Sequence, residues 1–490
     1  MDRLSWGREE MYAQFVERNA DWNGRFVVGI KTTGIYCLPT CPARKSKLEN
    51  TLFFPDEEHA LGAGLRACKR CKPNHFYRNF DPTLELLEAL VSSVRSAPAS
   101  MPDVGAMQSF TKLGKTKLSE SFREHYHESP ANFLARTRTL AVAERLLTES
   151  SKPLDLAFEL GFESASAFHE NFGKHLGVQP GGYKSLVHGG AFKLQLPIDF
   201  LAARTLKLLG RDQNSVTERL NGNRFSKALR LDGRDGLLEI KLSEKTARCE
   251  VISSRPISPQ GMAQAHNVAI RMLGLNCDPN PLQKLVRRTK GLSRLTSGRE
   301  GLRVLLTADV FEALIWSIIG QQVNLAFAMA LRTRLIELTA KHKSPKHFDG
   351  LLAHPQPADI AQLDYDDLKP LQFSRRKAEY VIDVSRSFVS GELDLDQLAD
   401  MSATRLSDTL LALRGIGPWS ANYVMMRGVG FNDSLPVGDS GISSSLKSFF
   451  DLSERPSAEK TRELMQPFRP HRSLACLHLW QRLNDLDSKP

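Results

Sequence analysis

Two closely spaced cysteine pairs near the N-terminus constrain the fold of this chain more than any other feature of its sequence. Three residues lie between Cys37 and Cys41, two between Cys68 and Cys71, and 26 between the pairs. Cysteines paired on turns can present four thiolates to a tetrahedral metal ion, and the remaining three cysteines are too scattered for a disulfide framework. The pattern predicts one Zn²⁺ bound by these four residues. Spacing alone favours a zinc ion that only holds a small domain together.

Length and charge narrow the class of partner. A chain of 490 residues is too long for one core, so we expect several domains. The formal charge of +11 favours a polyanionic partner, with nucleic acid ahead of a membrane surface. No apolar run is long enough to cross a membrane, and Met1–Ser5 lacks a signal-peptide pattern. We therefore expect a cytoplasmic, nucleoid-associated protein that binds DNA and no membrane.

The residues that flank the cysteines indicate a chemical role for the cluster in addition to a structural one. The segments 31–44 (KTTGIYCLPTCPAR) and 63–73 (AGLRACKRCKP) closely resemble the N-terminal domain of the bacterial Ada family. The resemblance implies that Cys37 is a zinc-bound thiolate that irreversibly takes a methyl group from a DNA methylphosphotriester, since zinc keeps the sulfur deprotonated yet nucleophilic. Methylation removes one negative charge, so it should tighten DNA binding. The candidate backbone contacts are the basic residues Arg44, Arg66, Lys69, Arg70 and Lys72.

Residues 81–187 predict a second, helical DNA-binding region. A Ser/Ala/Pro stretch over 92–102 predicts a linker or loop after a first helix. Residues 153–183 give helix, glycine turn and helix, and they resemble the AraC-type tandem helix-turn-helix domain, with an upstream copy over 104–130 that departs in its first helix. The resemblance implies that the second helix of each unit enters a major groove, although a solvated face is the alternative for each residue. The candidate contacts are Lys115, Thr116, Lys117, Ser119, Ser164, Ser166, His169 and Asn171.

A small α/β module is expected over 191–302. Strand-like runs at 238–242 and 247–252 precede a helical pattern at 262–273. The segment 284–303 holds seven basic residues and one acidic residue, which suits either a phosphate contact or a solvated connector.

The segment from Leu413 to Asp439 is the most informative part of the C-terminal half. Gly415 and Gly417 flank one apolar residue, so the backbone can turn tightly with exposed N–H groups, and the following helix aims its positive dipole end at the same place. This pattern predicts a phosphate-binding turn. Asp439 follows Trp419 by twenty residues at an expected helix start, where spacing alone favours a simple N-cap.

The order of motifs from residue 195 onward resembles the AlkA-type 3-methyladenine glycosylases of the helix-hairpin-helix superfamily. The matching segments are 200–204, 311–323, 368–371, 375–378, 413–423 and 470–480. The resemblance implies that Asp439 is the catalytic carboxylate, which stabilises an oxocarbenium-like transition state and orients or deprotonates water while an alkylated purine leaves. Electron-rich rings favour a flipped cationic base. The implied pocket rings are Trp419, Tyr423, Trp480 and Phe200.

Departures from that family sharpen the expected chemistry. Gln322 stands where an apolar leucine would fill the gap left by the flipped base, and Trp419 stands where bifunctional relatives carry a lysine. We therefore expect hydrolysis without strand cleavage. Cys476 is alone in the C-terminal region, so no iron–sulfur cluster is expected. A monovalent cation at the hairpin remains open, and the Pro-Cys-His-Arg motif of O6-alkylguanine repair is absent.

Together the patterns predict a multidomain, mainly helical α+β protein. Its expected parts are a zinc methyl-acceptor domain over 1–80, a tandem helix-turn-helix over 81–187, an AlkA-like α/β domain over 191–302 and a helix-hairpin-helix glycosylase domain over 303–490. The resemblances imply a monofunctional glycosylase for alkylated purines, joined to a Cys37 switch that controls transcription. The alternative is a regulator whose glycosylase-like half only binds DNA. Double-stranded DNA is the expected partner, RNA polymerase is a further candidate, and two helix-turn-helix units in one chain favour a monomer.

Overall fold

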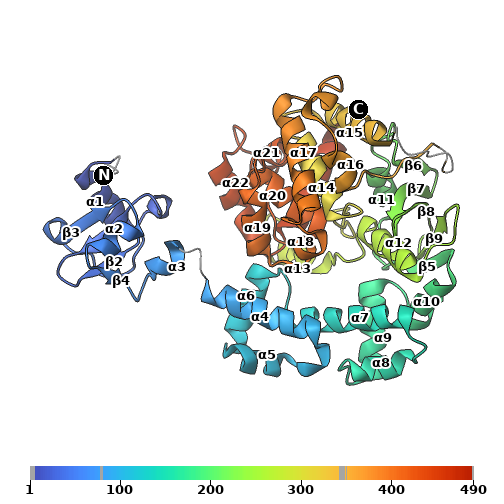
Figure 1. The fold of residues 1–490 in the computed structure, drawn as a ribbon, viewed down its shortest axis with the longest axis horizontal. Coiled ribbons are helices and arrows are strands. Elements are labelled where there is room, and N and C mark those ends of the chain that lie inside the picture. The colour runs from blue at the N-terminus through green and yellow to red at the C-terminus, as the bar shows by residue number, and fades with distance from the viewer. Residues whose placement is uncertain (1–5, 78–80, 341–347, 349, 488–490) are drawn as a thin grey trace. The chain divides into compact units, whose positions relative to one another are not determined.

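The computed structural model describes residues 6–77, 81–340, 348 and 350–487. Its contacts divide the chain into two units, Met1–Ala89 and Leu90–Pro490 (Figure 1). The segment Met1–Ser5 and the expected boundary at residue 80 lie outside the described residues. In the part of the chain that is described, no helix is both long and apolar enough to span a membrane.

The first unit is built on a small sheet. Its strands follow the order β3-β1-β2-β4 among the described residues, with β2 and β4 parallel and the other pairs antiparallel. The elements are α1 Arg8–Glu17, β1 Val27–Ile30, β2 Ile35–Cys37, β3 Thr51–Phe54, α2 Glu57–Gly62, β4 Arg66–Ala67 and α3 Pro73–Tyr77. Met11, Phe15 and Phe26 are buried beside the cysteines. The core of this unit is small, as expected for a domain that a metal ion completes.

The helices from Pro82 onward confirm the expected helical region with one correction. They are α4 Pro82–Ser96, α5 Val104–Thr111, α6 Lys115–His125, α7 Pro130–Thr148, α8 Pro153–Glu159, α9 Ala165–Leu176 and α10 Pro180–Lys184. The linker expected from Ser92 is wrong in its first part, because α4 continues to Ser96. Val91 and Val94 are buried, so they extend the apolar face that the pattern before them begins.

The α/β module contains an antiparallel sheet of order β5-β9-β8-β7-β6. Its elements are β5 Ala191–Gln195, α11 Ala202–Leu209, β6 Glu218–Asn221, β7 Arg224–Leu231, β8 Arg234–Leu242, β9 Thr246–Ile252 and α12 Pro259–Met272. Burial alternates along β5 and β9, since one face of each strand meets the core and the other meets solvent. The expected strands and helix of this segment are confirmed.

The remaining chain is helical and is organised around α14 Val310–Ile319, which is buried on nearly every side. Its other helices are α13 Asn280–Arg288, α15 Leu325–Ala340, α16 Pro357–Ala361, α17 Arg375–Ser390, α18 Leu395–Asp400, α19 Ala403–Ala412, α20 Pro418–Val424, α21 Ser440–Phe449, α22 Ala458–Met465 and α23 Arg472–Asp487. A π-helical turn, Met425–Val429, follows α20 directly.

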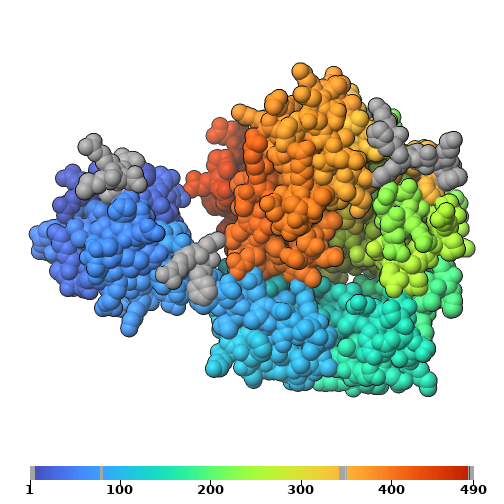
Figure 2. Space-filling view, in the orientation of Figure 1, coloured from blue at the N-terminus to red at the C-terminus, as the bar shows by residue number. Residues whose placement is uncertain are grey.

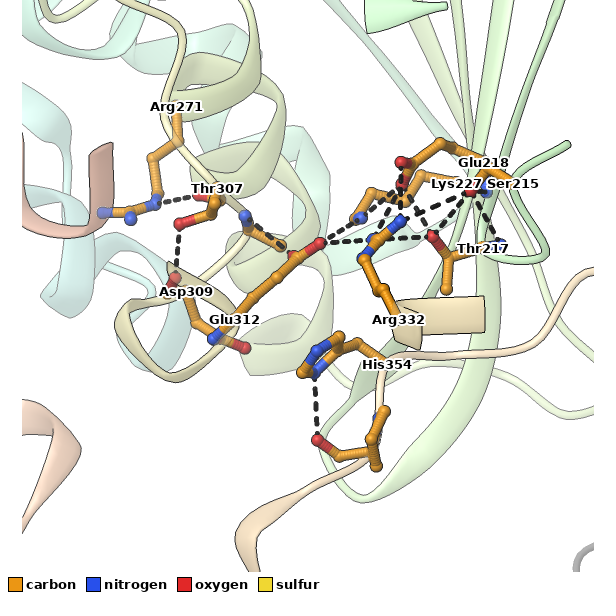
Figure 3. Close-up of polar contacts among 12 residues, drawn as sticks. Ser215, Thr217, Glu218, Lys227, Arg271, Thr307, Asp309, Glu312, Arg332 and His354 are labelled. Carbon is orange, nitrogen blue, oxygen red and sulfur yellow. Dashed lines mark hydrogen bonds and ion pairs between the residues drawn. The ribbon is translucent and has the colours of Figure 1, made fainter. Parts of the chain in front are cut away.

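Polar contacts tie the parts of the second unit together. His125 of α6 hydrogen-bonds through Nδ1 to Thr404 Oγ1 of α19 at 2.9 Å. The space-filling view shows the second unit as one continuous body (Figure 2). Between the module and the helical core lies a buried charge network. Glu312 accepts bonds from Lys227 at 3.0 Å and from Arg332 at 2.8 Å, and both cations also bind Glu218 (Figure 3). Burial alone would raise the pKa of Glu312, but the two cations lower it to about 2.

Candidate functional site

The first candidate site is the cysteine cluster. Cys37 ends β2, Cys41 lies on the turn after it, Cys68 follows β4, and Cys71 precedes α3. Their four Sγ atoms lie within 4.8 Å of one another, close to the edge of about 3.8 Å that a tetrahedral Zn–S₄ centre requires. The Leu38 N–H donates to Cys71 Sγ at 3.4 Å. The donor set and its spacing therefore fit zinc.

The electrostatics of this cluster favour a bound cation. The hydrogen bond with Cys41 raises the pKa of Cys37, whereas the hydrogen bond with Cys37 lowers the pKa of Cys41. The four sulfurs therefore cannot all ionise unless a cation lies among them. Arg44, Arg66, Lys69, Arg70 and Lys72 are all exposed around the cluster, as contacts to a phosphate backbone require.

The second candidate site is the hairpin between α19 and α20. Gly415 has φ +87°, and a Cβ there would collide with the Tyr380 ring, so glycine is required by both backbone and space. Gly417 is the N-cap of α20 and a Cβ there would meet open space, which leaves the helix start accessible. Gln321 Nε2 fixes the turn by donating to Gly415 O at 2.8 Å and Ser420 Oγ at 3.0 Å. An accessible helix N-terminus after a glycine turn suits a phosphate.

Asp439 is both a helix cap and the acceptor for two tryptophans. Its Oδ1 accepts the Ile442 N–H at 2.8 Å, which caps α21. The same oxygen accepts the indole N–H of Trp480 at 2.9 Å, and Oδ2 accepts that of Trp419 at 3.0 Å. Three bonds fix the carboxylate in position, and among the described residues Oδ2 accepts only the one from Trp419. Oδ2 therefore keeps a lone pair that a water molecule or a sugar cation can use.

The loop before Asp439 is held at several points. Asp433 accepts bonds from Arg472 at 2.7 Å and from Arg469 at 3.1 Å. Asn422 of α20 accepts the Leu435 N–H at 3.0 Å. These contacts tie the loop to α20 and α23, which are the helices that carry Trp419 and Trp480. The carboxylate and both indoles are thus set on one rigid frame.

The expected pocket rings do not all meet. Tyr423 stacks on Trp419 with ring centroids 5.4 Å apart and an interplanar angle of 25°. Trp480 joins them through Asp439. Phe200 instead lies in the hydrophobic cluster of the α/β module and the helices next to it, where it is 9% exposed. Its role in the base pocket stays a prediction.

The residues expected to contact DNA are differently placed. Gln322 is exposed with φ +55°, a left-handed conformation that costs a non-glycine residue free energy. Leu325 nearby is 53% exposed, and its exposure is visible only in the structure, since a leucine in a helical pattern reads as core. Ser166 and His169 are exposed on α9. Ser164 caps that helix, and Asn171 donates to Ala167 O at 2.8 Å.

Three family descriptions match the chain. The metal-binding domain of Ada matches residues 10–74, a helix-turn-helix domain matches residues 109–185, and the HhH-GPD superfamily of base excision DNA repair proteins matches residues 315–470. These matches define a class of protein in which DNA-binding and base-excision folds share one chain. The chain therefore joins an Ada-type zinc-binding domain and a helix-turn-helix domain to a domain of the HhH-GPD superfamily. The resemblances inferred from the motifs and the mainly helical multidomain fold are confirmed.

Individual relatives agree with this architecture. A Mycobacterium tuberculosis protein named "Probable bifunctional transcriptional activator/DNA repair enzyme AlkA" is 26% identical over 97% of this chain and 96% of its own. A Bacillus subtilis DNA-3-methyladenine glycosylase is 28% identical over 59% of this chain and 95% of its own. The B. subtilis protein YfjP is 36% identical, but the chain spans only 64% of its length. The solved 3-methyladenine DNA-glycosylase from Archaeoglobus fulgidus has the same fold, with a TM-score of 0.53 at 21% identity over 61% of this chain and all of that one.

Proposed function

We propose that the C-terminal part of the chain hydrolyses the glycosidic bond of alkylated purines in DNA, with Asp439 as its catalytic carboxylate. The observation that carries the proposal is that two indole N–H groups donate hydrogen bonds to that carboxylate at 2.9 and 3.0 Å. A helix cap needs one backbone donor, so a cap alone does not explain two tryptophans from α20 and α23 on the same carboxylate.

The arrangement supports hydrolysis of a bond that is already weakened. An N3- or N7-alkylated purine is cationic, so it leaves with little protonation, and the stacked rings of Trp419 and Tyr423 favour a cation. Asp439 Oδ2 then stabilises the developing positive charge on the sugar and orients or deprotonates the attacking water. The position that holds a lysine in bifunctional relatives is occupied by Trp419, whose indole cannot form a Schiff base. The expected products are the free base and an abasic site in an uncut strand.

For the N-terminal unit, the proposal is a stoichiometric methyl transfer. The Cys37 thiolate attacks the methyl carbon of a DNA methylphosphotriester, an S–C bond forms, the C–O bond breaks, and a phosphodiester anion leaves. When bound, zinc keeps the sulfur ionised. Loss of one negative charge at the cluster then favours DNA, and this switch would act on transcription through the helix-turn-helix region. Double-stranded DNA is the proposed partner, whereas RNA polymerase, nucleoid association and a monovalent cation at the hairpin remain predictions.

Two assays test these assignments. Methylated duplex DNA is incubated with the wild type and with Asp439→Asn, and released bases are quantified; equal release would refute the catalytic role of Asp439, and no release by the wild type would show that the glycosylase-like half only binds DNA. In the second assay, DNA carrying radiolabelled methylphosphotriesters is incubated with the wild type and with Cys37→Ser. One label per wild-type chain and none on the variant are expected, and equal labelling would refute the role of Cys37.

A further inference from the structure

A cavity of about 100 Å³ lies between the α/β module and the helical core of the second unit. Tyr423 and Trp316 form an aromatic part of its lining, and Arg211 and Arg427 are among its lining residues as well. Of its charged lining residues, four are basic and three are acidic. One positive charge is therefore in excess at this place, which favours a ligand that offers hydrogen-bond acceptors.

Most of the charges in the lining are already paired. Lys227 and Arg332 bind Glu218 and Glu312 in the network that Figure 3 draws. Two cations and two carboxylates neutralise one another there, so this network forms a fixed polar wall. The remaining basic groups, Arg211 and Arg427, decide what the cavity can bind.

The backbone around Arg427 is clamped in an unusual geometry. Arg427 lies in the π-helical turn Met425–Val429, a feature that occurs often at functional sites. Thr307 donates to the Arg427 carbonyl through its N–H at 2.9 Å and its hydroxyl at 3.2 Å. Arg271 donates to the carbonyl of Gly428. It also donates, at 3.0 Å, to that of Thr307 (Figure 3). These donors take up carbonyls of the turn, so Thr307 and Arg271 hold the backbone at Arg427 in place.

One donor of the Arg427 guanidinium has no hydrogen-bond partner among the described residues. This donor is Nε, which is buried. Burial lowers the pKa of Arg427, while Tyr423 and Glu312 act to raise it. A guanidinium stays charged in proteins and offers only donors. A buried donor without an acceptor is destabilising, and such groups call for a functional explanation.

Arg427 follows the aromatic residues of the candidate base pocket along the chain. Trp419 and Tyr423 are separated by one helical turn, and the π-turn with Arg427 comes next along the same helix. Tyr423 belongs to both places, because its ring stacks on Trp419 and also lines the cavity. Tyr423 therefore links the aromatic stack beside Asp439 to the lining of the cavity.

We propose that this cavity is the inner end of the base pocket and that Arg427 is a specificity-determining residue, which donates to the carbonyl oxygen of a guanine-type base. The inference rests on the proposed glycosylase function and names the substrate class of the same site. A carbonyl at C6 accepts hydrogen bonds from a guanidinium, whereas the amino group of an adenine-type base offers donors and meets it unfavourably. Arg211, which lies 5.9 Å from the Trp316 ring centroid, adds positive charge at the same end.

The test compares two bases that carry the methyl group on the same atom. Methylated duplex DNA containing 3-methylguanine and 3-methyladenine is incubated with the full-length protein, and the released bases are separated and quantified. In Arg427→Met we expect release of 3-methylguanine to fall about tenfold, as for loss of one charged donor, while release of 3-methyladenine stays within about twofold. Arg427→Lys keeps a charged donor and should lie between the wild type and Arg427→Met.

The two products in one reaction provide an internal control for folding. Arg224→Met is the matched control, since Arg224 is exposed on β7 and pairs with Glu239 away from the cavity. An equal loss of both bases in Arg427→Met would show a structural role and overturn the inference, as would an unchanged ratio. If the wild type releases neither base, the glycosylase assignment itself is wrong and the inference falls with it.

Discussion

In the first unit, all four cysteines of the cluster come from 35 residues of chain and lie on short strands and turns. The Asp439 site of the second unit instead joins side chains from α20, the N-cap of α21 and α23, with 60 residues between the two tryptophans. A packed core holds these helices, since Ile442, Leu446 and Leu477 are buried in one cluster that Trp480 touches. The cysteine cluster is formed by residues close together in the chain, whereas the carboxylate site is formed by helices that a packed core holds together.

This difference predicts what each region needs in order to stay folded. A unit with a small core and four convergent thiolates depends on the metal ion for its stability. The fold around the carboxylate site depends on apolar burial, so it loses little stability when one polar group is changed. Treatments that remove metal and substitutions that remove charge should therefore affect the two regions separately.

Metal removal should give the largest effect. Cys68→Ser, or a strong chelator, should unfold the first unit, because structural zinc contributes about 10–16 kcal/mol of binding free energy. Base release by the second unit should persist. Zinc content and circular dichroism measure the first outcome, and the base-release assay measures the second. Cys249→Ala is the control, because Cys249 is buried in the α/β module outside the cluster. A variant that loses zinc yet melts like the wild type would contradict the comparison.

Substitution of Asp439 should separate catalysis from stability. Asp439→Asn should lower the rate of base release about 10²–10³-fold, or about 3–4 kcal/mol, because an amide cannot stabilise a sugar cation. Its oxygen can still accept the Ile442 N–H, so the free energy of unfolding should change by less than about 1 kcal/mol. Single-turnover assays and urea titrations measure the two quantities.

Asp394→Asn provides a matched control for that variant. Asp394 is an exposed N-cap of α18 that accepts the Gln397 N–H at 2.8 Å. The same substitution there should leave base release unchanged. Equal losses of activity in the two variants would mean that Asp439 acts only as a cap.

Mild acid should weaken the second unit through a buried histidine. His266 is 1% exposed among the rings of Tyr183 and Phe192, and burial lowers its pKa from 6.5 to about 4. The unfolded chain binds a proton as the pH falls below 6.5 and the folded chain does not until about pH 4. Stability is therefore lost over that window, by about 2 kcal/mol at pH 5. His266→Phe should reduce the loss of unfolding free energy between pH 6.5 and 4 by that amount, and the exposed His188→Phe should not.

The sequence predicted the two sites to different depths for a physical reason. Two closely spaced cysteine pairs are typical of a metal site, so the cluster was predictable from spacing. Asp439 was ambiguous because a cap and a catalytic carboxylate look alike in sequence, and the structure shows that its two tryptophans come from distant helices. The π-turn around Arg427 was not predictable, since it depends on Thr307 and Arg271 packed against it. Burial of Val94 extended a helix that composition alone would have ended.

Trp480→Phe should give the smallest effect and shows whether the tryptophan acts through Asp439. The variant keeps an aromatic ring but loses the N–H that donates to Oδ1, while the Ile442 and Trp419 donors remain. Loss of one hydrogen bond to a charged group should slow base release about tenfold, or about 1.4 kcal/mol. In the Asp439→Asn background the same change should cost almost nothing more, because its effect depends on the carboxylate. Equal losses in both backgrounds would mean that Trp480 supports the fold or the base independently, and Trp22→Phe in the first unit is the control for the substitution itself.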